Sequence, residues 1–405
     1  MAEFFVMDRE RLGSWLSRLA VLGVVCFLCA PWVLPSNTYY HRLVILFLWI
    51  PAFWHFCLFH RGYPKIHKVF AGLYLAISIW YVFVVVMSSD GWDEVRELKL
   101  PFYIALSLLG VMVAAMHLKE RFRDLLLLCC VFGGLAAGFT CFYTYFVQGH
   151  IFYYRVVSFG VWRVVIPAAQ ACGALAILTA MLGLEAKRNV WVISAVLLAL
   201  LGYAAFLYFN QSRWIWVCLM LSFIAVGVLL RSKSAYVMAA IAVLSISVIM
   251  IFKPTLMLSR GFSYRPELWI GGLSLLLENW VHGLGFQEYW IQIAELKISS
   301  RHPHNLFLDI GIRFGVLGLL LWAGIWCWAG WTAFNYRNTT LGGAVIALWL
   351  YSGLVVLTEG TVPWVKPSPI WFVTWLPIAL ALVIDALARQ ARRDRVPSVQ
   401  MSGGV

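Results

Sequence analysis

Charged residues are scarce in this sequence of 405 amino acids: 12% are Asp, Glu, Lys or Arg, whereas 62% are hydrophobic. A water-soluble domain typically has about twice that charged fraction. The scarcity excludes a water-soluble enzyme. The formal net charge of +13 does not indicate nucleic-acid binding, because no block of basic residues forms a soluble binding face. We attribute the positive charge to the loops of a membrane protein.

The sequence also shows no signal of a cleavable leader and no cysteine framework. The first apolar run, near residues 18–34, ends without a small-residue cleavage pattern, so it is predicted to be retained as a span. All nine cysteines fall inside apolar runs, which is typical of packing residues. Cys26 and Cys29 have Cys-x-x-Cys spacing, but a first span without nearby His or Asp is a poor zinc site. We expect no disulfide and no cysteine metal site.

Long hydrophobic runs are what the sequence does contain. A helix needs about 20 apolar residues to cross the hydrocarbon core of a bilayer. The runs predict roughly twelve spans, near residues 18–34, 42–59, 69–88, 100–117, 125–147, 164–184, 190–209, 214–230, 235–251, 313–334, 340–358 and 370–388. The predicted fold is therefore an all-α, polytopic integral membrane protein, with one membrane domain over residues 1–405.

The charge of the short loops predicts the orientation. One side has compact basic loops, at residues 60–68, 117–124, 185–189 and 231–234. The opposite side has one short loop that contains Asp90, Asp93, Glu94 and Glu97. Because basic loops stay in the cytoplasm, both termini are predicted to be cytoplasmic. Residues 389–405 read as a basic cytoplasmic tail.

Thirteen Lys and Arg residues fall on the predicted outer side, against this rule, and nine of them are Arg. Any one of them could anchor a lipid headgroup from the end of a span. A guanidinium group also suits bidentate binding of phosphate or carboxylate. As a set beside a long outer segment, these arginines predict an anion-binding site. Those that we single out are Arg155, Arg163, Arg213, Arg265 and Arg301.

The long outer segment covers residues 252–312, between the ninth and tenth predicted spans. It is rich in Trp, Leu and Ile, so it is predicted to fold onto the membrane surface or into the helix bundle. Pro266 and Glu267 are typical of a first helical turn, which predicts a helix that runs to about residue 278. A second short helix is predicted over about 287–297.

The segment ends in Ser-Ser-Arg-His-Pro-His-Asn, residues 299–305. His304 is the best candidate for proton transfer, because imidazole can take up a proton near neutral pH. A zinc site made of His302, His304 and Asp309 is a weaker interpretation, because no further nitrogen or sulfur ligand lies at a recognised spacing. We predict no metal. A glycosidase-like pair of carboxylates is an alternative that the sequence alone cannot pair. Its candidates are Glu267, Glu278, Glu288, Glu295 and Asp309.

These residues resemble the signature of bacterial O-antigen ligases. His304-Asn305 is followed, after nine residues, by Gly315-Val316-Leu317-Gly318, which matches that signature without a gap. Ser212-Arg213 resembles the Ser-Arg element of the wider ligase and polymerase superfamily. Arg265 and the stretch 279–285 are similar to a further element of it. Arg155 and Arg163 fall where members have an outer loop with arginines, although the usual Asn-Pro-Asn of that loop is absent.

The resemblance implies a fold similar to the GT-C glycosyltransferases, in the bacterial inner membrane, with a periplasmic active site. Such enzymes transfer a glycan from undecaprenyl pyrophosphate to a sugar hydroxyl of lipid A–core. They invert the anomeric centre and use neither cofactor nor metal. On this basis His304 is expected to be the general base, and Arg265 and Arg213 to hold the pyrophosphate. Residues expected to bind substrate or its phosphates are Arg155, Arg163, Arg301, His302 and Asn305.

Other functions stay open at this point. An O-antigen polymerase of the same superfamily has two long outer loops with Arg-x10-Gly elements, whereas here one loop is long and Arg260 to Gly271 has that spacing. A protein O-oligosaccharyltransferase usually has an extra domain near its C-terminus. A transporter of lipid-linked glycans would be a different class, but it tends to show internal repeats and charges at mid-membrane. We find no repeat in this sequence.

Overall fold

The computed structural model describes residues 2–63, 66–88, 95–152, 154–184, 189–255, 264–293 and 298–395. The helices that form the first half of the bundle are α1 (Ala2–Val33), α2 (Asn37–Val44), α3 (Ile50–Phe59), α4 (Lys68–Ser88), α6 (Leu100–Leu118) and α7 (Arg121–Phe142). The second half contains α8 (Val165–Gly183), α9 (Val190–Asn210), α10 (Arg213–Leu230), α11 (Lys233–Phe252), α14 (Leu306–Asn335), α15 (Thr340–Val356) and α16 (Trp375–Arg395).

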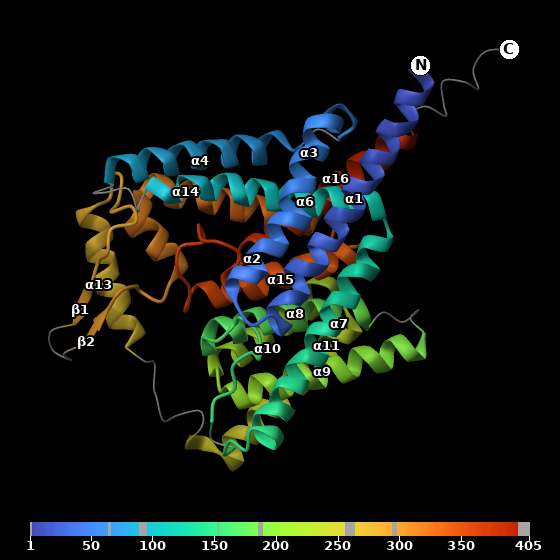
Figure 1. Ribbon diagram of the computed structural model, residues 1–405. Helices are drawn as coiled ribbons and strands as arrows, with labels where there is room; N and C mark the ends of the chain where they lie inside the picture. Colours follow the sequence, from blue (N-terminus) through green and yellow to red (C-terminus); the bar gives the residue numbers. More distant parts are fainter. Residues whose placement is uncertain are drawn as a thin grey trace.

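The prediction of an all-α membrane protein is confirmed. In the described part of the chain, eleven helical stretches are long and apolar enough to cross a membrane, and α15 is a shorter apolar helix. Together they coincide with the twelve predicted runs. The start of α1 and the end of α16 lie at one end of the molecule, and the helix α13 (Arg265–Glu278) lies at the other (Figure 1). Asp90, Asp93, Glu94, Arg260 and the tail from residue 396 lie outside the described residues.

The long outer segment differs in part from its prediction. The helix expected over 266–278 is present as α13, but the one expected over 287–297 is wrong. Residues 291–293 instead form β1, which pairs antiparallel with β2 at residues 298–300. Ile291 is buried against α13, and β-branched residues of this kind favour a half-buried strand over a helix.

A kink shapes the outer end of α14, which begins at Leu306 rather than at the predicted residue 313. Gly315 has φ +66°, a backbone conformation that a side chain would strain, and a Cβ there would collide with the loop that follows α13. That loop satisfies the backbone groups which the kink leaves unpaired. Val316 N–H donates to the Trp280 carbonyl at 2.9 Å, and Leu284 N–H donates to Ile312 at 2.9 Å. The first glycine of the ligase-like signature is therefore structural, and it joins the outer segment to the bundle.

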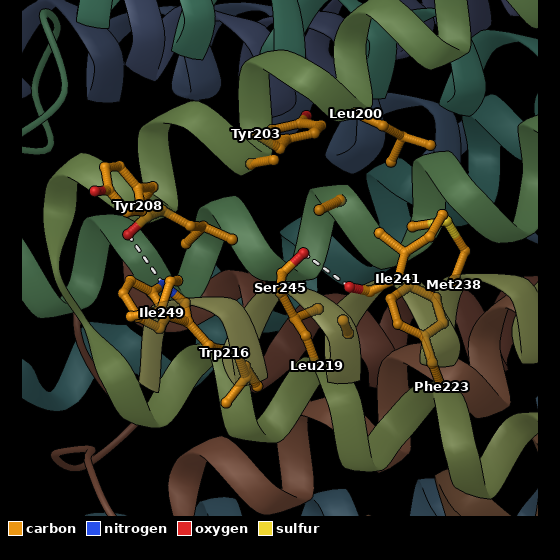
Figure 2. A pocket seen from close by; sticks show the side chains of 15 residues that line it. Leu200, Tyr203, Tyr208, Trp216, Leu219, Phe223, Met238, Ile241, Ser245 and Ile249 are labelled. Atoms are coloured by element: carbon orange, nitrogen blue, oxygen red, sulfur yellow. Dashed lines mark hydrogen bonds between the residues drawn. The ribbon is translucent and has the colours of Figure 1, made fainter. Parts of the chain in front are cut away.

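An apolar cavity of about 310 Å³ lies between α9, α10 and α11 (Figure 2). Its walls extend from Tyr208, Trp216 and Ile249 to Phe223 and Met238. Two polar side chains in the wall are hydrogen-bonded within the protein. Trp216 Nε1 donates to the Leu207 carbonyl at 3.0 Å, and Ser245 Oγ donates to the Ile241 carbonyl at 2.7 Å. The cavity therefore presents mainly hydrocarbon to any occupant.

Candidate active site

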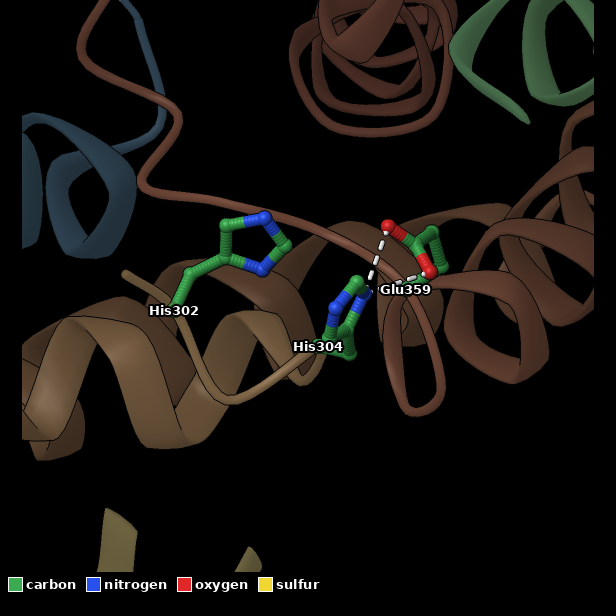
Figure 3. Close-up of side chains that lie close together, drawn as sticks. All are labelled: His302, His304 and Glu359. Atoms are coloured by element: carbon green, nitrogen blue, oxygen red, sulfur yellow. Dashed lines mark hydrogen bonds and ion pairs between the residues drawn. The ribbon is translucent and has the colours of Figure 1, made fainter. Parts of the chain in front are cut away.

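The carboxylate of Glu359 is the centre of the candidate site. Glu359 follows the end of α15, and His304 precedes the start of α14, yet their side chains meet (Figure 3). His304 Nδ1 lies 2.8 Å from Glu359 Oε2 and 3.0 Å from Oε1. The backbone of Glu359 is also held, because the buried Gln170 of α8 donates from Nε2 to its carbonyl at 3.2 Å. The contact therefore joins the outer segment to the core of the bundle.

Arg265 approaches the same carboxylate from a third element. It is the first residue of α13, and its guanidinium Nη2 lies 3.2 Å from Glu359 Oε2. The side chains are only partly accessible, with relative exposures of 22% for Arg265 and 12% for Glu359. An ion pair at this depth is screened less than a surface pair, so the three side chains are held in a defined arrangement.

The electrostatics of the site determine the protonation of the pair. Burial alone would raise the pKa of Glu359. The hydrogen bond and charge of His304, together with those of Arg265, outweigh that effect and hold the pKa below its ordinary value. Glu359 is therefore ionised at neutral pH and accepts a hydrogen bond from Nδ1–H of His304. In the neutral form of the ring, this contact places the proton on Nδ1 and leaves Nε2 with the lone pair of a base.

His302 lies beside this pair. Its ring centroid is 4.1 Å from that of His304, and its buried Nδ1 has no hydrogen-bond partner among the described residues. Burial and the neighbouring His304 lower the pKa of His302, so this ring is neutral at pH 7. Ligand atoms of His302, His304 and Glu359 lie within 4.8 Å of one another, a spacing that suits a metal ion. The guanidinium of Arg265 on the same carboxylate opposes a second cation there.

Asp309 does not join the two histidines, so the grouping considered for zinc is wrong. Its fully buried carboxylate accepts hydrogen bonds from Tyr289 Oη, from Arg313 Nε at 3.2 Å and from Val362 N–H at 2.6 Å. These donors come from the outer segment, from α14 and from the chain that follows Glu359. Asp309 therefore fixes the start of α14 to the segment that positions Glu359.

Left-handed backbone marks the approach to three site residues. His304 has φ +53°, Tyr264 before Arg265 has φ +57°, and Gln211, two residues before Arg213, has φ +59°. Such angles are uncommon for residues other than glycine, and they persist only where the surroundings impose them. Their positions indicate that the fold holds these segments in specific local conformations.

The structure brings two further predicted arginines to the end of α9. Arg155 Nε donates to the Asn210 carbonyl at 2.9 Å, and Asn210 directly precedes the turn to Arg213. Arg213 is the first residue of α10, and Trp214 beside it donates to the Leu354 carbonyl of α15 at 3.4 Å. Arg213 is thus placed on a helix that contacts α15 shortly before Glu359.

The other predicted binding residues make different contacts. Arg163 donates to the Pro35 carbonyl at 3.1 Å, in the link between α1 and α2. Arg301 pairs with Glu288 at 3.3 Å and stacks over Trp290, with its guanidinium carbon 4.5 Å from the ring centroid. Asn305 is the N-cap of α14, where its side chain accepts from Leu308 N–H at 3.1 Å. None of these contacts involves Glu359, whose side chain contacts His304 and Arg265.

Sequence reasoning missed Glu359. Only 18 residues of the chain are Asp or Glu, so an acidic residue at the predicted outer end of an apolar span was a signal. The partner of such a carboxylate depends on how α13, α14 and α15 pack together, which no sequence spacing reveals.

Comparisons with known proteins found similarity to O-antigen ligases. A family model described as O-antigen ligase matches residues 173–323, which include Arg213, Arg265, His304 and the Gly315 kink. A curated O-antigen ligase from Pseudomonas aeruginosa is 25% identical over 391 residues, which cover 95% of this chain and 94% of the relative. The match extends over nearly the whole length of both proteins. The chain is therefore similar to O-antigen ligases.

Proposed function

We propose that this protein transfers an O-antigen glycan from undecaprenyl pyrophosphate to a sugar hydroxyl of lipid A–core. Similarity to O-antigen ligases supports glycosyl transfer in lipopolysaccharide synthesis. The observation that carries the finer proposal is the meeting of His304, Arg265 and Glu359. It combines a base whose free nitrogen is defined with a cation suited to a phosphate leaving group.

His304 is the proposed general base. The acceptor hydroxyl oxygen attacks the anomeric carbon and forms the new glycosidic bond, while its proton passes to Nε2 of His304. The bond from the anomeric carbon to the phosphate oxygen breaks, and its electron pair leaves with the pyrophosphate. Attack opposite the leaving group inverts the anomeric centre. Glu359 holds the ring through Nδ1–H and stabilises the imidazolium that forms, as a carboxylate beside a catalytic histidine does.

Arginines are the proposed partners of the leaving group. Charge builds up on the pyrophosphate as the bond breaks, and preorganised guanidinium groups stabilise such charge. Arg265 is already oriented by Glu359, and Arg213 lies at the start of α10, on the helix that contacts α15. Arg155 is hydrogen-bonded to Asn210 at the C-terminal end of α9, close to Arg213 in the chain. Arg163 and Arg301, with His302 and Asn305, complete the residues that we propose for substrate binding.

The cavity between α9, α10 and α11 supports a donor with a long hydrocarbon chain. Trp216, in its wall, lies one helical turn beyond Arg213. The wall of α11 extends from Ile249 to Met238, which spans roughly 16 Å at the rise of an α-helix. A prenyl chain could enter this cavity while its pyrophosphate stays near Arg213, because most of the wall consists of apolar side chains.

We propose that the site faces the periplasm of a bacterial inner membrane and that both termini are cytoplasmic. The charge of the short loops supports this orientation. We also propose that transfer needs no metal. The ion pair of Arg265 with Glu359 supports this, since the guanidinium supplies the positive charge that a metal would bring. Transfer that a chelator abolishes and a divalent ion restores would contradict it.

The test uses the purified full-length protein with lipid-linked O-antigen and lipid A–core. The wild type is expected to place glycan on the acceptor. His304→Ala is expected to reduce the rate about 100- to 10,000-fold, the usual contribution of a general base. His67→Ala, outside the site, is the matched control and is expected to retain activity. Glycan added instead to a second lipid-linked glycan would identify a polymerase, and normal transfer by His304→Ala would reject the assigned base.

A further inference from the structure

The strands β1 and β2 form a small sheet beside α13, at the end of the molecule away from the start of α1 (Figure 1). Ile291 packs onto that helix at Gly271, where a Cβ atom would lie 2.6 Å from the Cγ2 atom of Ile291. Successive side chains of a strand point to opposite faces, so Gln292 points away from α13, and it is exposed. Ser299, its partner in β2, is exposed as well. The sheet therefore has an outward face that the described part of the chain leaves uncovered.

Trp290, directly before β1, belongs to this outward face by the same alternation. The guanidinium carbon of Arg301 lies 4.5 Å from the centroid of its ring, and Nη1 of Arg301 pairs with Glu288 at 3.3 Å. Trp290 nevertheless stays 44% exposed, and the side chains of Arg301 and Glu288 are 61% and 70% exposed. Arg301 thus orients an indole ring that still offers surface to a ligand.

The chemistry of the outward face suits a sugar. The indole of Trp290 is flat and largely apolar, so it can pack against the C–H face of a pyranose ring. The carboxylate, guanidinium, amide and hydroxyl groups around it can accept and donate the hydrogen bonds that sugar hydroxyls require. The ion pair of Glu288 with Arg301 leaves the described side chains of this face without net charge, so an anionic lipid headgroup gains no electrostatic advantage there. The face therefore favours a neutral, hydroxyl-rich ligand.

The outward face adjoins the proposed base. Arg301 directly precedes His302, and the ring centroid of His302 lies 4.1 Å from that of His304. Arg265, the proposed partner of the pyrophosphate, lies about 9 Å along α13 from Gly271, at the rise of an α-helix. The face is therefore displaced from the leaving group and lies next to the segment that takes the acceptor proton.

We propose that the outward face is a subsite for a sugar of the acceptor, next to the sugar that carries the attacking hydroxyl. The inference rests on the proposed function and assigns Trp290 to recognition of the acceptor. Trp290 stacks on the sugar ring, and Glu288 and Arg301 exchange hydrogen bonds with its hydroxyls. No bond forms or breaks at this subsite, so it acts on the affinity for the acceptor and leaves the chemical step unchanged.

The test measures transfer by the full-length protein in detergent, with lipid-linked O-antigen as donor and lipid A–core as acceptor. Trp290→Ala is expected to raise the KM for lipid A–core about fivefold, because the packing of the ring on the sugar is lost. The KM for the donor and kcat are expected to change less than twofold. Trp290→Phe, which keeps a flat ring, should retain most of the affinity. Trp191→Ala is the matched control and should match the wild type, because Trp191 is an exposed tryptophan at the start of α9, outside the site.

A second measurement does not depend on turnover. The core oligosaccharide, released from its lipid, is titrated against the same variants, and its binding is followed by saturation-transfer NMR. The wild type is expected to bind it, and Trp290→Ala is expected to bind it about fivefold more weakly. Because this ligand has no acyl chains, a role of Trp290 in anchoring lipid headgroups cannot produce that difference.

Unchanged oligosaccharide affinity in Trp290→Ala would overturn the proposal, and a raised acceptor KM in that case would assign Trp290 to the lipid. A donor KM that rises as much as the acceptor KM would overturn it as well. A wild type that binds the oligosaccharide through Trp290 but transfers nothing to lipid A–core would reject the proposed function and keep the subsite. Thermal unfolding in detergent, measured first, confirms that each variant is folded. If Trp290→Ala fails this check, Trp290→Leu replaces it, because leucine keeps apolar bulk without a flat ring.

Discussion

At the scale of single residues, the site depends on one carboxylate that serves two partners. Glu359 orients the ring of His304 and the guanidinium of Arg265 at the same time. The proposed base and the proposed leaving-group cation thus contact the same carboxylate, so a change in one side chain alters the position of the other. The lowered pKa of Glu359 keeps this support ionised through the neutral range. Loss of activity between pH 7 and 6 would therefore have a cause other than protonation of Glu359.

Replacement of Arg265 by Lys tests the geometry of the proposed leaving-group contact. A lysine retains the charge but cannot form two parallel hydrogen bonds, and its ammonium is a point charge. We expect Arg265→Lys to lower kcat about 10- to 100-fold, which corresponds to about 1.4 to 2.8 kcal/mol in the barrier. Arg121→Lys, exposed at the start of α7 and outside the site, is the control and should change kcat less than twofold. Equal kcat for Arg265→Lys and the wild type would remove Arg265 from the reaction.

Glu359→Gln tests the electrostatic role through stability. Because the pKa of Glu359 is lower in the folded protein than in the unfolded chain, its ionised form stabilises the fold above the unfolded pKa of about 4.3. This contribution is lost as the pH falls through the lowered, folded value. The gap in Tm between the wild type and Glu359→Gln is therefore expected to be largest at pH 6 to 7 and to shrink below about pH 4. Thermal scans in detergent across this range measure it, and a gap independent of pH would contradict the ionised pair.

At the scale of elements, the site exists because several short segments cross at the outer end of α14. The loop after α13 packs against the Gly315 kink, and Asp309 in the first turn of α14 accepts a hydrogen bond from Val362 N–H. His304 and Glu359 are thereby held by backbone on both sides of the contact. The ligase-like signature thus combines two roles. Its histidine is the proposed general base, and its first glycine permits the kink that positions the surrounding chain.

A bulky substitution on α11 that fills the cavity tests whether a prenyl chain binds between α9, α10 and α11. Ala242 lines this cavity, whereas Ala240 is exposed on the same helix and does not. We expect Ala242→Phe to raise KM at least tenfold for a donor with a full-length prenyl chain. For a donor shortened to one or two isoprene units, KM should change less than twofold. Ala240→Phe should leave both unchanged. An equal rise in KM for long and short donors would show that the substitution disturbs the protein rather than the chain.

At the scale of the whole molecule, hydrophobic runs predicted the bundle well. Each run of about twenty apolar residues became a helix, because backbone groups inside a bilayer must pair within their own segment. The outer segment was less predictable, since outside the bilayer strand and helix compete. Ile291 and its neighbours formed a strand there. His304 and Arg265 were predicted from their residue types and spacing, whereas Glu359 was not, because its role comes from the packing of α15 against α10 and α14.

Orientation in the membrane is the prediction that belongs to the whole molecule. The basic loops place residues such as Asn338, between α14 and α15, in the cytoplasm, and α13 on the other side. Single thiols can report this, since the native cysteines lie within the spans. In intact cells with a permeable outer membrane, we expect an impermeant maleimide to label Ser274→Cys on α13. Asn338→Cys should react only after the inner membrane is broken. The reverse pattern would place the Glu359 cluster in the cytoplasm, where a periplasmic acceptor could not reach it.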